Sequence, residues 1–174
     1  MKWKTVKKTL DNFLDTLVAV SMVVLTIDVT WQVITRFILN NPSDWTEELA
    51  TNLMIWVGLL GAAVALNHKA HLGIDYFVGR LPLKKQIYTE TFGYLAVALF
   101  SVFVMFFGGL QLVTMTFRLG QVSPSLGVPM GYVYLAIPVA GVFLTIYSDE
   151  FFIETFVKIK HAARKPNAPD IDVK

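Results

Sequence analysis

Residues 91–117, TFGYLAVALFSVFVMFFGGLQLVTMTF, contain no charged side chain and decide the class of this protein. As a helix, these 27 residues would be about 40 Å long at 1.5 Å per residue. The hydrocarbon core of a bilayer is only roughly 30 Å thick. Such a helix can cross a membrane if it tilts or if a partner covers its excess length. The stretch therefore predicts a membrane span.

The rest of the chain has the same character. Hydrophobic residues make up 55% of the sequence and charged residues 16%, whereas a soluble domain carries about a quarter charged residues. Four apolar stretches are long enough to cross a bilayer, near residues 14–38, 49–66, 91–117 and 130–148. The sequence predicts an all-α integral membrane protein with four tilted transmembrane helices. It forms a single membrane domain over residues 1–160, followed by a flexible cytoplasmic tail over residues 161–174.

The basic residues predict how the spans are oriented. Thirteen of the fifteen Lys and Arg residues lie before the first span, between the second and third spans, or after the fourth span. Cytoplasmic segments of membrane proteins are enriched in Lys and Arg. Both termini are therefore expected in the cytoplasm, and the segments 40–48 and 120–129 are expected to face outward.

The connection between the second and third spans is too long for a tight hairpin. Its apolar residues recur at helical spacing, and Pro82 ends the pattern. We expect an interfacial amphipathic helix on the cytoplasmic side, whose basic residues reach phospholipid headgroups. The alternative is a cytoplasmic extension of the second span. The residues assigned to this helix are Ile74, Phe77, Val78, Leu81, Lys84 and Lys85.

The first span carries a polar stripe. Asp28, Gln32 and Arg36 are four residues apart and share one helix face. Ionisable residues within a membrane span are costly and usually mark a functional or interface position. One interpretation makes Asp28 a proton or ion site. The favoured interpretation is a polar seam that hydrogen-bonds another helix.

Acidic residues begin the second span. Glu47 and Glu48 follow Trp45 near the outer membrane surface, and Arg36 ends the first span on the same side. We expect an ion pair between Arg36 and these carboxylates across the short turn. Asp44 can cap the helix, and acidic residues in its first turn favour the helix dipole.

The sequence shows no pattern typical of an enzyme or of a metal or cofactor site. It has no cysteine, phosphate-binding loop, nucleophile motif or zinc signature, and its composition indicates no nucleic-acid partner. His68, His71 and Asp75 have a weakly metal-like spacing, which headgroup contact or helix capping explains as well. We therefore expect no catalytic residue, substrate-binding residue, metal or cofactor.

Several short motifs resemble the small membrane subunit, of the DctQ type, of TRAP (tripartite ATP-independent periplasmic) transporters. Their order and spacing carry the resemblance from about Leu14 to Phe152. The motifs are Arg36-Phe37, Asn40-x-Pro42-x-x-Trp45-x-Glu47-Glu48, Trp56 with Gly61-Ala62-Ala63, His71-x-x-Ile74-Asp75, Leu81-Pro82, Ser125-Leu126-x-x-Pro129 and Tyr134-x-x-x-Pro138.

The resemblance implies a subunit without a transport site of its own, in the unfused form, in the bacterial inner membrane. Such a subunit braces a large multi-span subunit that transports an organic acid with sodium. A periplasmic binding protein delivers the substrate, of the sialic acid or C4-dicarboxylate class, and the small subunit is expected to help dock it. Asp28 and Gln32 would then contact helices of the large subunit.

The alternative is a stand-alone, small proton-coupled exporter with Asp28 as its proton site. Small exporters with four spans place a carboxylate in the first span. The long connection after the second span and the neighbouring Gln32 and Arg36 argue against this alternative.

Overall fold

The computed structural model describes residues 2–68 and 82–164, and nearly all of them are helical. Four helices are long and apolar enough to cross a membrane, over Lys7–Phe37, Asp44–Asn67, Lys85–Arg118 and Met130–Val157. The described residues contain no β-strand, only an isolated bridge between Val122 and Pro129. The predicted all-α membrane protein with four spans is confirmed.

The first, third and fourth spans are longer than predicted at their ends nearest the basic segments, and the second begins five residues earlier, at Asp44. The first is α1 (Lys2–Phe37), which includes the basic N-terminal segment, and the second is α2 (Asp44–Asn67). The third consists of α4 (Leu83–Phe100), η1 (Ser101–Gly108) and α5 (Gly109–Arg118) without interruption. The fourth consists of α6 (Met130–Tyr134) and α7 (Ala136–Arg164).

Two predictions concern segments at the limits of the described residues. The apolar face of the expected interfacial helix, residues 74–81, lies outside them, as does the tail beyond Arg164. Lys84 and Lys85 belong to the first turn of α4, so they begin the third span instead of the interfacial helix. This is a correction: α4 begins directly after Pro82, because proline is favoured at a helix start and cannot continue a helix that precedes it.

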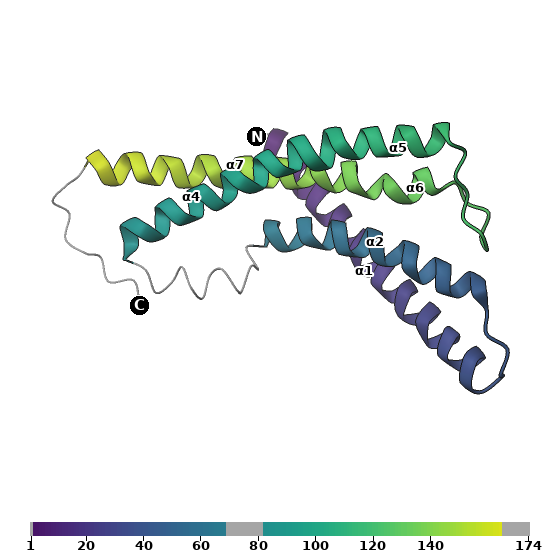
Figure 1. Ribbon diagram of the computed structural model, residues 1–174. Helices are drawn as coiled ribbons and strands as arrows, with labels where there is room; N and C mark the ends of the chain where they lie inside the picture. Colours follow the sequence, from purple (N-terminus) through teal and green to yellow (C-terminus); the bar gives the residue numbers. More distant parts are fainter. Residues whose placement is uncertain (1, 69–81, 165–174) are drawn as a thin grey trace.

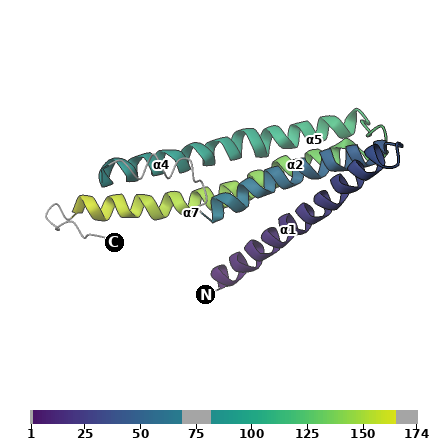
Figure 2. The same ribbon diagram turned by 90° about the horizontal axis from the view of Figure 1, so that it is seen from below.

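The helices form a row (Figures 1 and 2). α1 packs along α2, α2 packs on α7, and the helix formed by α4, η1 and α5 covers the other side of α6 and α7. Figure 2 shows α1 on one outer side of the row and α4 with α5 on the opposite side. In Figure 1 the α1–α2 hairpin diverges from α5 and α6 toward its loop.

The core lies where α2, η1 and α7 meet. Tyr147 is 1% exposed, and it packs with residues of α1, α2 and η1 in one apolar cluster. The buried members are Leu14, Leu60, Ala63, Leu66, Met105, Ala140, Leu144, Tyr147 and Phe151. Most apolar side chains of α1 and of the third span instead point outward, as expected for helices whose solvent is lipid.

The middle of the third span, η1, is a π-helix, and it packs against Gly141 of α7. A Cβ atom on Gly141 of α7 would lie 2.9 Å from Met105 Cβ and 3.2 Å from the Ser101 carbonyl oxygen. The Ser101 hydroxyl lies 2.9 Å from the Thr145 hydroxyl, which in turn donates to the Gly141 carbonyl at 2.8 Å. The π-helical turn and α7 therefore approach closely and share a small hydrogen-bonded contact.

Pro138 lies close to an interruption in the helix of the fourth span. The helix of the fourth span is interrupted at Leu135, between α6 and α7. Proline has no backbone N–H, so the carbonyl of Tyr134, four residues earlier, loses its usual partner. On the facing helix, Gly109 leaves room for the proline ring, since a Cβ there would lie 2.9 Å from Pro138 Cδ.

Candidate functional site

The loop between α5 and α6 is fastened to the start of α2 by one carboxylate. Glu48 Oε2 accepts hydrogen bonds from the backbone N–H groups of Ser125 at 2.8 Å and Leu126 at 3.0 Å. Within the loop, the Ser123 N–H donates to the Val128 carbonyl at 2.9 Å, and Gly127 adopts a positive φ of 65°. Glu48 thus joins the segments 40–48 and 120–129, which were both predicted to face outward.

An open depression lies beside this contact. Its volume is about 390 Å³, and it lies between the first two turns of α2 and the loop before α6. Asp44 and Glu47 are both exposed at its edge, and Glu48 is half-buried. The lining residues are Asp44, Glu47, Glu48, Thr51, Asn52, Pro124, Ser125 and Met130. The depression is open, and three of its lining side chains are carboxylates.

The predicted ion pair between Arg36 and the acidic residues of α2 is not formed. Among the residues that the structure describes, no ion pair joins Arg36 to Glu47 or Glu48, and the Arg36 side chain is exposed. The prediction was wrong because Glu48 is turned toward the α5–α6 loop, where two backbone N–H groups bind it. Backbone N–H donors satisfy a carboxylate as well as a guanidinium does. Trp45 is 48% exposed at the same end of α2.

Of the polar stripe of α1, Asp28 and Gln32 face the hairpin partner α2, whereas Arg36 is exposed. Asp28 is 6% exposed and Thr35 is 5% exposed, whereas Gln32 is half-buried. Since α2 is the helix that packs along α1, Asp28 is covered within the hairpin and does not lie on the outer surface. Its Oδ2 atom has no hydrogen-bond partner among the described residues. A contact of Asp28 with a helix of another subunit would require the hairpin to open.

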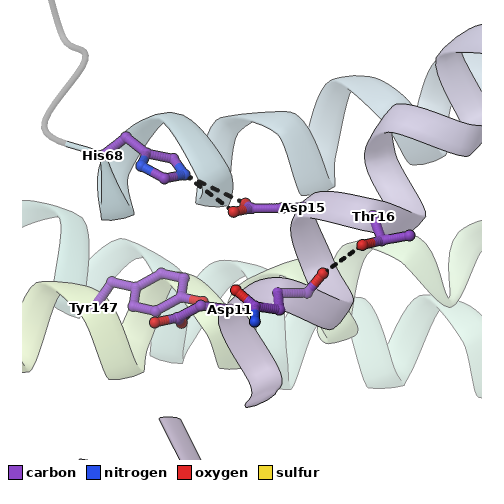
Figure 3. A network of polar contacts seen from close by, with 6 residues as sticks. Asp11, Asp15, Thr16, His68 and Tyr147 are labelled. Atoms are coloured by element: carbon purple, nitrogen blue, oxygen red, sulfur yellow. Dashed lines mark hydrogen bonds and ion pairs between the residues drawn. The ribbon is translucent and has the colours of Figure 1, made fainter. Parts of the chain in front are cut away.

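At the other end of the molecule, α1 is tied to α7 and α2 by a polar network (Figure 3). The Tyr147 hydroxyl of α7 donates to Asp11 Oδ1 at 2.7 Å. Asp15 Oδ2, one turn further along α1, lies 3.2 Å from His68 Nε2 just after α2. Lys7 forms an ion pair with Glu150, and its ammonium group lies 5.8 Å from the centre of the Tyr147 ring.

The sequence analysis missed this network. The available signal was the spacing of Lys7, Asp11 and Asp15, which are four residues apart and therefore share a face of α1. Their partners lie 53 to 143 residues away, so no local pattern could have paired them.

The His68 ring takes part in this network through its contact with Asp15. No group of three His, Cys, Asp or Glu side chains that could hold a metal ion occurs in the parts of the chain that the structure describes. His71 and Asp75, the other residues of the weakly metal-like spacing, lie outside those parts.

Comparison with known proteins assigns the chain to a transporter family. Residues 22–158 match the family model of the DctQ component of tripartite ATP-independent periplasmic transporters. The chain is 36% identical over 87 residues to the sialic acid TRAP transporter small permease protein SiaQ of Vibrio cholerae, and this alignment covers half of each protein. It is 35% identical over 94 residues to the C4-dicarboxylate TRAP transporter small permease protein DctQ of Rhodobacter capsulatus, covering 54% of this chain and 41% of that protein.

A third relative aligns over almost its full length. A putative TRAP transporter small permease protein of Haemophilus influenzae is 24% identical over 155 residues, which cover 89% of this chain and 88% of that protein. The relatives are named as permease proteins and not as enzymes. The family match covers the larger part of all four spans, so the chain belongs to the DctQ component family of tripartite ATP-independent periplasmic transporters and is a multi-pass protein of the inner membrane.

Proposed function

We propose that this chain is the non-catalytic small membrane subunit of a sodium-coupled secondary transporter for organic acids, and that it braces a large permease subunit in the bilayer. The observation that carries the proposal is the size of two relatives. Alignments with the sialic acid TRAP transporter permease protein SiaT and the isethionate TRAP transporter permease protein DctMQ cover 65% and 74% of this chain, but only 18% and 21% of those proteins. The equivalent of this chain is thus a minor part of a much larger permease.

The structure supports a bracing role over a transport role. Organic acids in secondary transporters are bound near the midplane, where broken helices present polar groups. Three open depressions lie on the surface of the described helices: the acidic one beside α2, one along α1 between Thr26 and Ile34, and one along α5 between Leu110 and Arg118. Asp28, the buried ionisable residue of the first span, lines none of these three depressions. We infer that the substrate and sodium sites belong to the large subunit.

The acidic depression at the outward end suits a second task. Asp44, Trp45 and Glu47 are exposed there, and Glu48 holds the two loops together. Exposed aromatic side chains such as tryptophan are enriched in protein–protein interfaces, and the rims of these interfaces are polar. We propose that this surface helps dock the periplasmic binding protein. The substrate class, sialic acid or a C4-dicarboxylate, rests on the names of two relatives.

Co-expression with a large TRAP permease subunit from the same organism tests the bracing role. An affinity tag on this chain is expected to recover the large permease in a fixed ratio from mild detergent. Proteoliposomes with both chains and the binding protein are expected to accumulate radiolabelled sialic acid or C4-dicarboxylate in response to an inward sodium gradient. Full uptake by the large permease without this chain would contradict the proposal, as would recovery of this chain as a homo-oligomer alone.

A further inference from the structure

The helix α5 has two opposite faces of different character. Gly109, Val113 and Thr116 are buried against α6 and α7, and they recur at i, i+4 and i+7. Half a turn away around the helix, the exposed face carries Gln111, Thr114, Met115 and Arg118, at i, i+3, i+4 and i+7. Together with Leu110, these four residues line an open depression of about 410 Å³.

The side-chain amide of Gln111 is the notable group on this face. It is exposed and makes no hydrogen bond to any of the described residues. Gln111 lies seven residues before Arg118, which is about 10 Å along the helix at 1.5 Å per residue. If Arg118 lies at the outer membrane surface, the amide is at the depth of the lipid tails. There it meets no water, and a lipid tail offers no hydrogen-bonding group.

Threonine side chains on the exposed faces of α1 and α5 need no such partner. Thr26 and Thr30 of α1 donate to the carbonyls of Met22 and Thr26 at 2.8 and 2.7 Å. Thr114 itself donates to the Leu110 carbonyl at 2.7 Å. These hydroxyl groups are therefore satisfied within their own helix and can face lipid. Gln111 differs because its amide carries two donors and one acceptor that its own helix leaves free.

We propose that the face of α5 formed by Gln111, Thr114, Met115 and Arg118 is where a transmembrane helix of the large permease subunit docks. This inference rests on the proposed function for the existence of that partner. The depth of the Gln111 amide in the bilayer indicates the kind of partner. About 10 Å below the membrane surface, hydrogen-bonding groups come from another membrane-spanning helix. A soluble protein or a lipid headgroup can reach Arg118 but not Gln111. The position of α5 on an outer side of the row leaves this face accessible (Figure 2).

Site-specific photo-crosslinking in the full complex tests this proposal. The chain offers three exposed methionines on three different helices, Met22 of α1, Met54 of α2 and Met115 of α5, with exposed fractions of 48%, 60% and 58%. Each is replaced in turn by p-benzoylphenylalanine, and the tagged chain is irradiated in membranes that contain the large permease. The variant at Met115 is expected to form an adduct with the large permease, and the variant at Met22 is not.

Three results would overturn the proposal. The first is an adduct with the large permease from Met22 or Met54 but none from Met115. The second is an adduct of twice the mass of this chain from Met115, which would place a second copy on this face. The third is the absence of any protein adduct from Met115 although the permease co-purifies. Loss of co-purification for the unmodified chain would instead refute the proposed function, so the two failures are distinguishable.

Substitution of the amide provides an independent measurement. Interhelical hydrogen bonds in membranes contribute about 0.6 kcal/mol on average. Gln111→Leu is therefore expected to weaken the complex about threefold, measured as the fraction of large permease recovered over a detergent dilution series. Gln111→Asn, which keeps the amide, restores recovery in part. Unchanged recovery with Gln111→Leu contradicts a role for the amide.

Discussion

The Tyr147 hydroxyl donates a hydrogen bond of 2.7 Å to Asp11, although the two residues are 136 positions apart in the chain. The bond joins the first helix to the last, and Lys7 reinforces it by pairing with Glu150 and lying over the Tyr147 ring. Along most of its length α1 packs only on α2, within the described residues. This network therefore determines where the N-terminal end of α1 lies relative to α7.

Tyr147→Phe is expected to destabilise the protein by about 1–3 kcal/mol, because the ring stays buried while the Asp11 carboxylate loses a buried donor. The measurement is the thermal unfolding midpoint in a mild detergent. Tyr132→Phe is the matched control, since Tyr132 is 56% exposed and makes no hydrogen bond through its hydroxyl to the described residues. Equal midpoints for the two variants would show that the bond contributes nothing measurable.

Glu48→Ala is expected to release the loop between α5 and α6. Each N–H group of Ser125 and Leu126 loses a charge-assisted partner, which is typically worth about 1.5–3 kcal/mol. Hydrogen exchange followed by mass spectrometry should show exchange at peptides covering 121–130 that is faster by roughly tenfold or more. Glu47→Ala, an exposed neighbour, should leave the same peptides unchanged. Faster exchange in both variants would point to general disruption of α2.

Gly141→Ala is expected to disturb the contact between α7 and the π-helical turn. The added Cβ would lie 2.9 Å from Met105 Cβ and 3.2 Å from the backbone oxygen of Ser101, and the latter cannot move without shifting the helix. Overpacking of this kind typically costs about 1–3 kcal/mol. Gly58→Ala is the control, because no heavy atom lies within 4 Å of its added Cβ and alanine favours a helix. A stable Gly141→Ala protein would mean that the π-helix relaxes readily to an α-helix.

The sequence was sufficient to predict the class of fold but not the contacts between helices. Long uncharged stretches such as 91–117 identify spans because lipid excludes unpaired charge, and all four were found in the expected places. The predicted spans were too short, since helical hydrogen bonding continues through the charged residues at the start of α1 and the end of α7, beyond the apolar core. The π-helix over Ser101–Gly108 has no local sequence signal, and neither does its close packing against Gly141 of α7.

The candidate site was predicted less well because its contacts join residues that are distant in the sequence. Arg36 and Glu48 were expected to pair because they are near in sequence and opposite in charge. Glu48 instead binds backbone N–H groups 77 and 78 positions away, which no charge pattern can reveal. Asp28 was singled out because it is ionisable within a span, but its burial against α2 depends on the rotation of α1, which spacing alone leaves open.

Asp28→Asn is expected to retain sodium-driven uptake when the variant is reconstituted with the large permease and the binding protein. Asparagine has nearly the same size, so it fits the buried position between α1 and α2, and a supporting subunit needs no titratable group there. The measurement is the initial rate of substrate uptake into proteoliposomes, with complex assembly checked by co-purification. Asp28→Lys, which forces a basic group into the same buried place, is the control and should reduce assembly. If Asp28→Asn assembled normally but lost uptake, Asp28 would take part in ion coupling. The alternative function, a proton-coupled exporter with Asp28 as its proton site, would then be favoured over the bracing role.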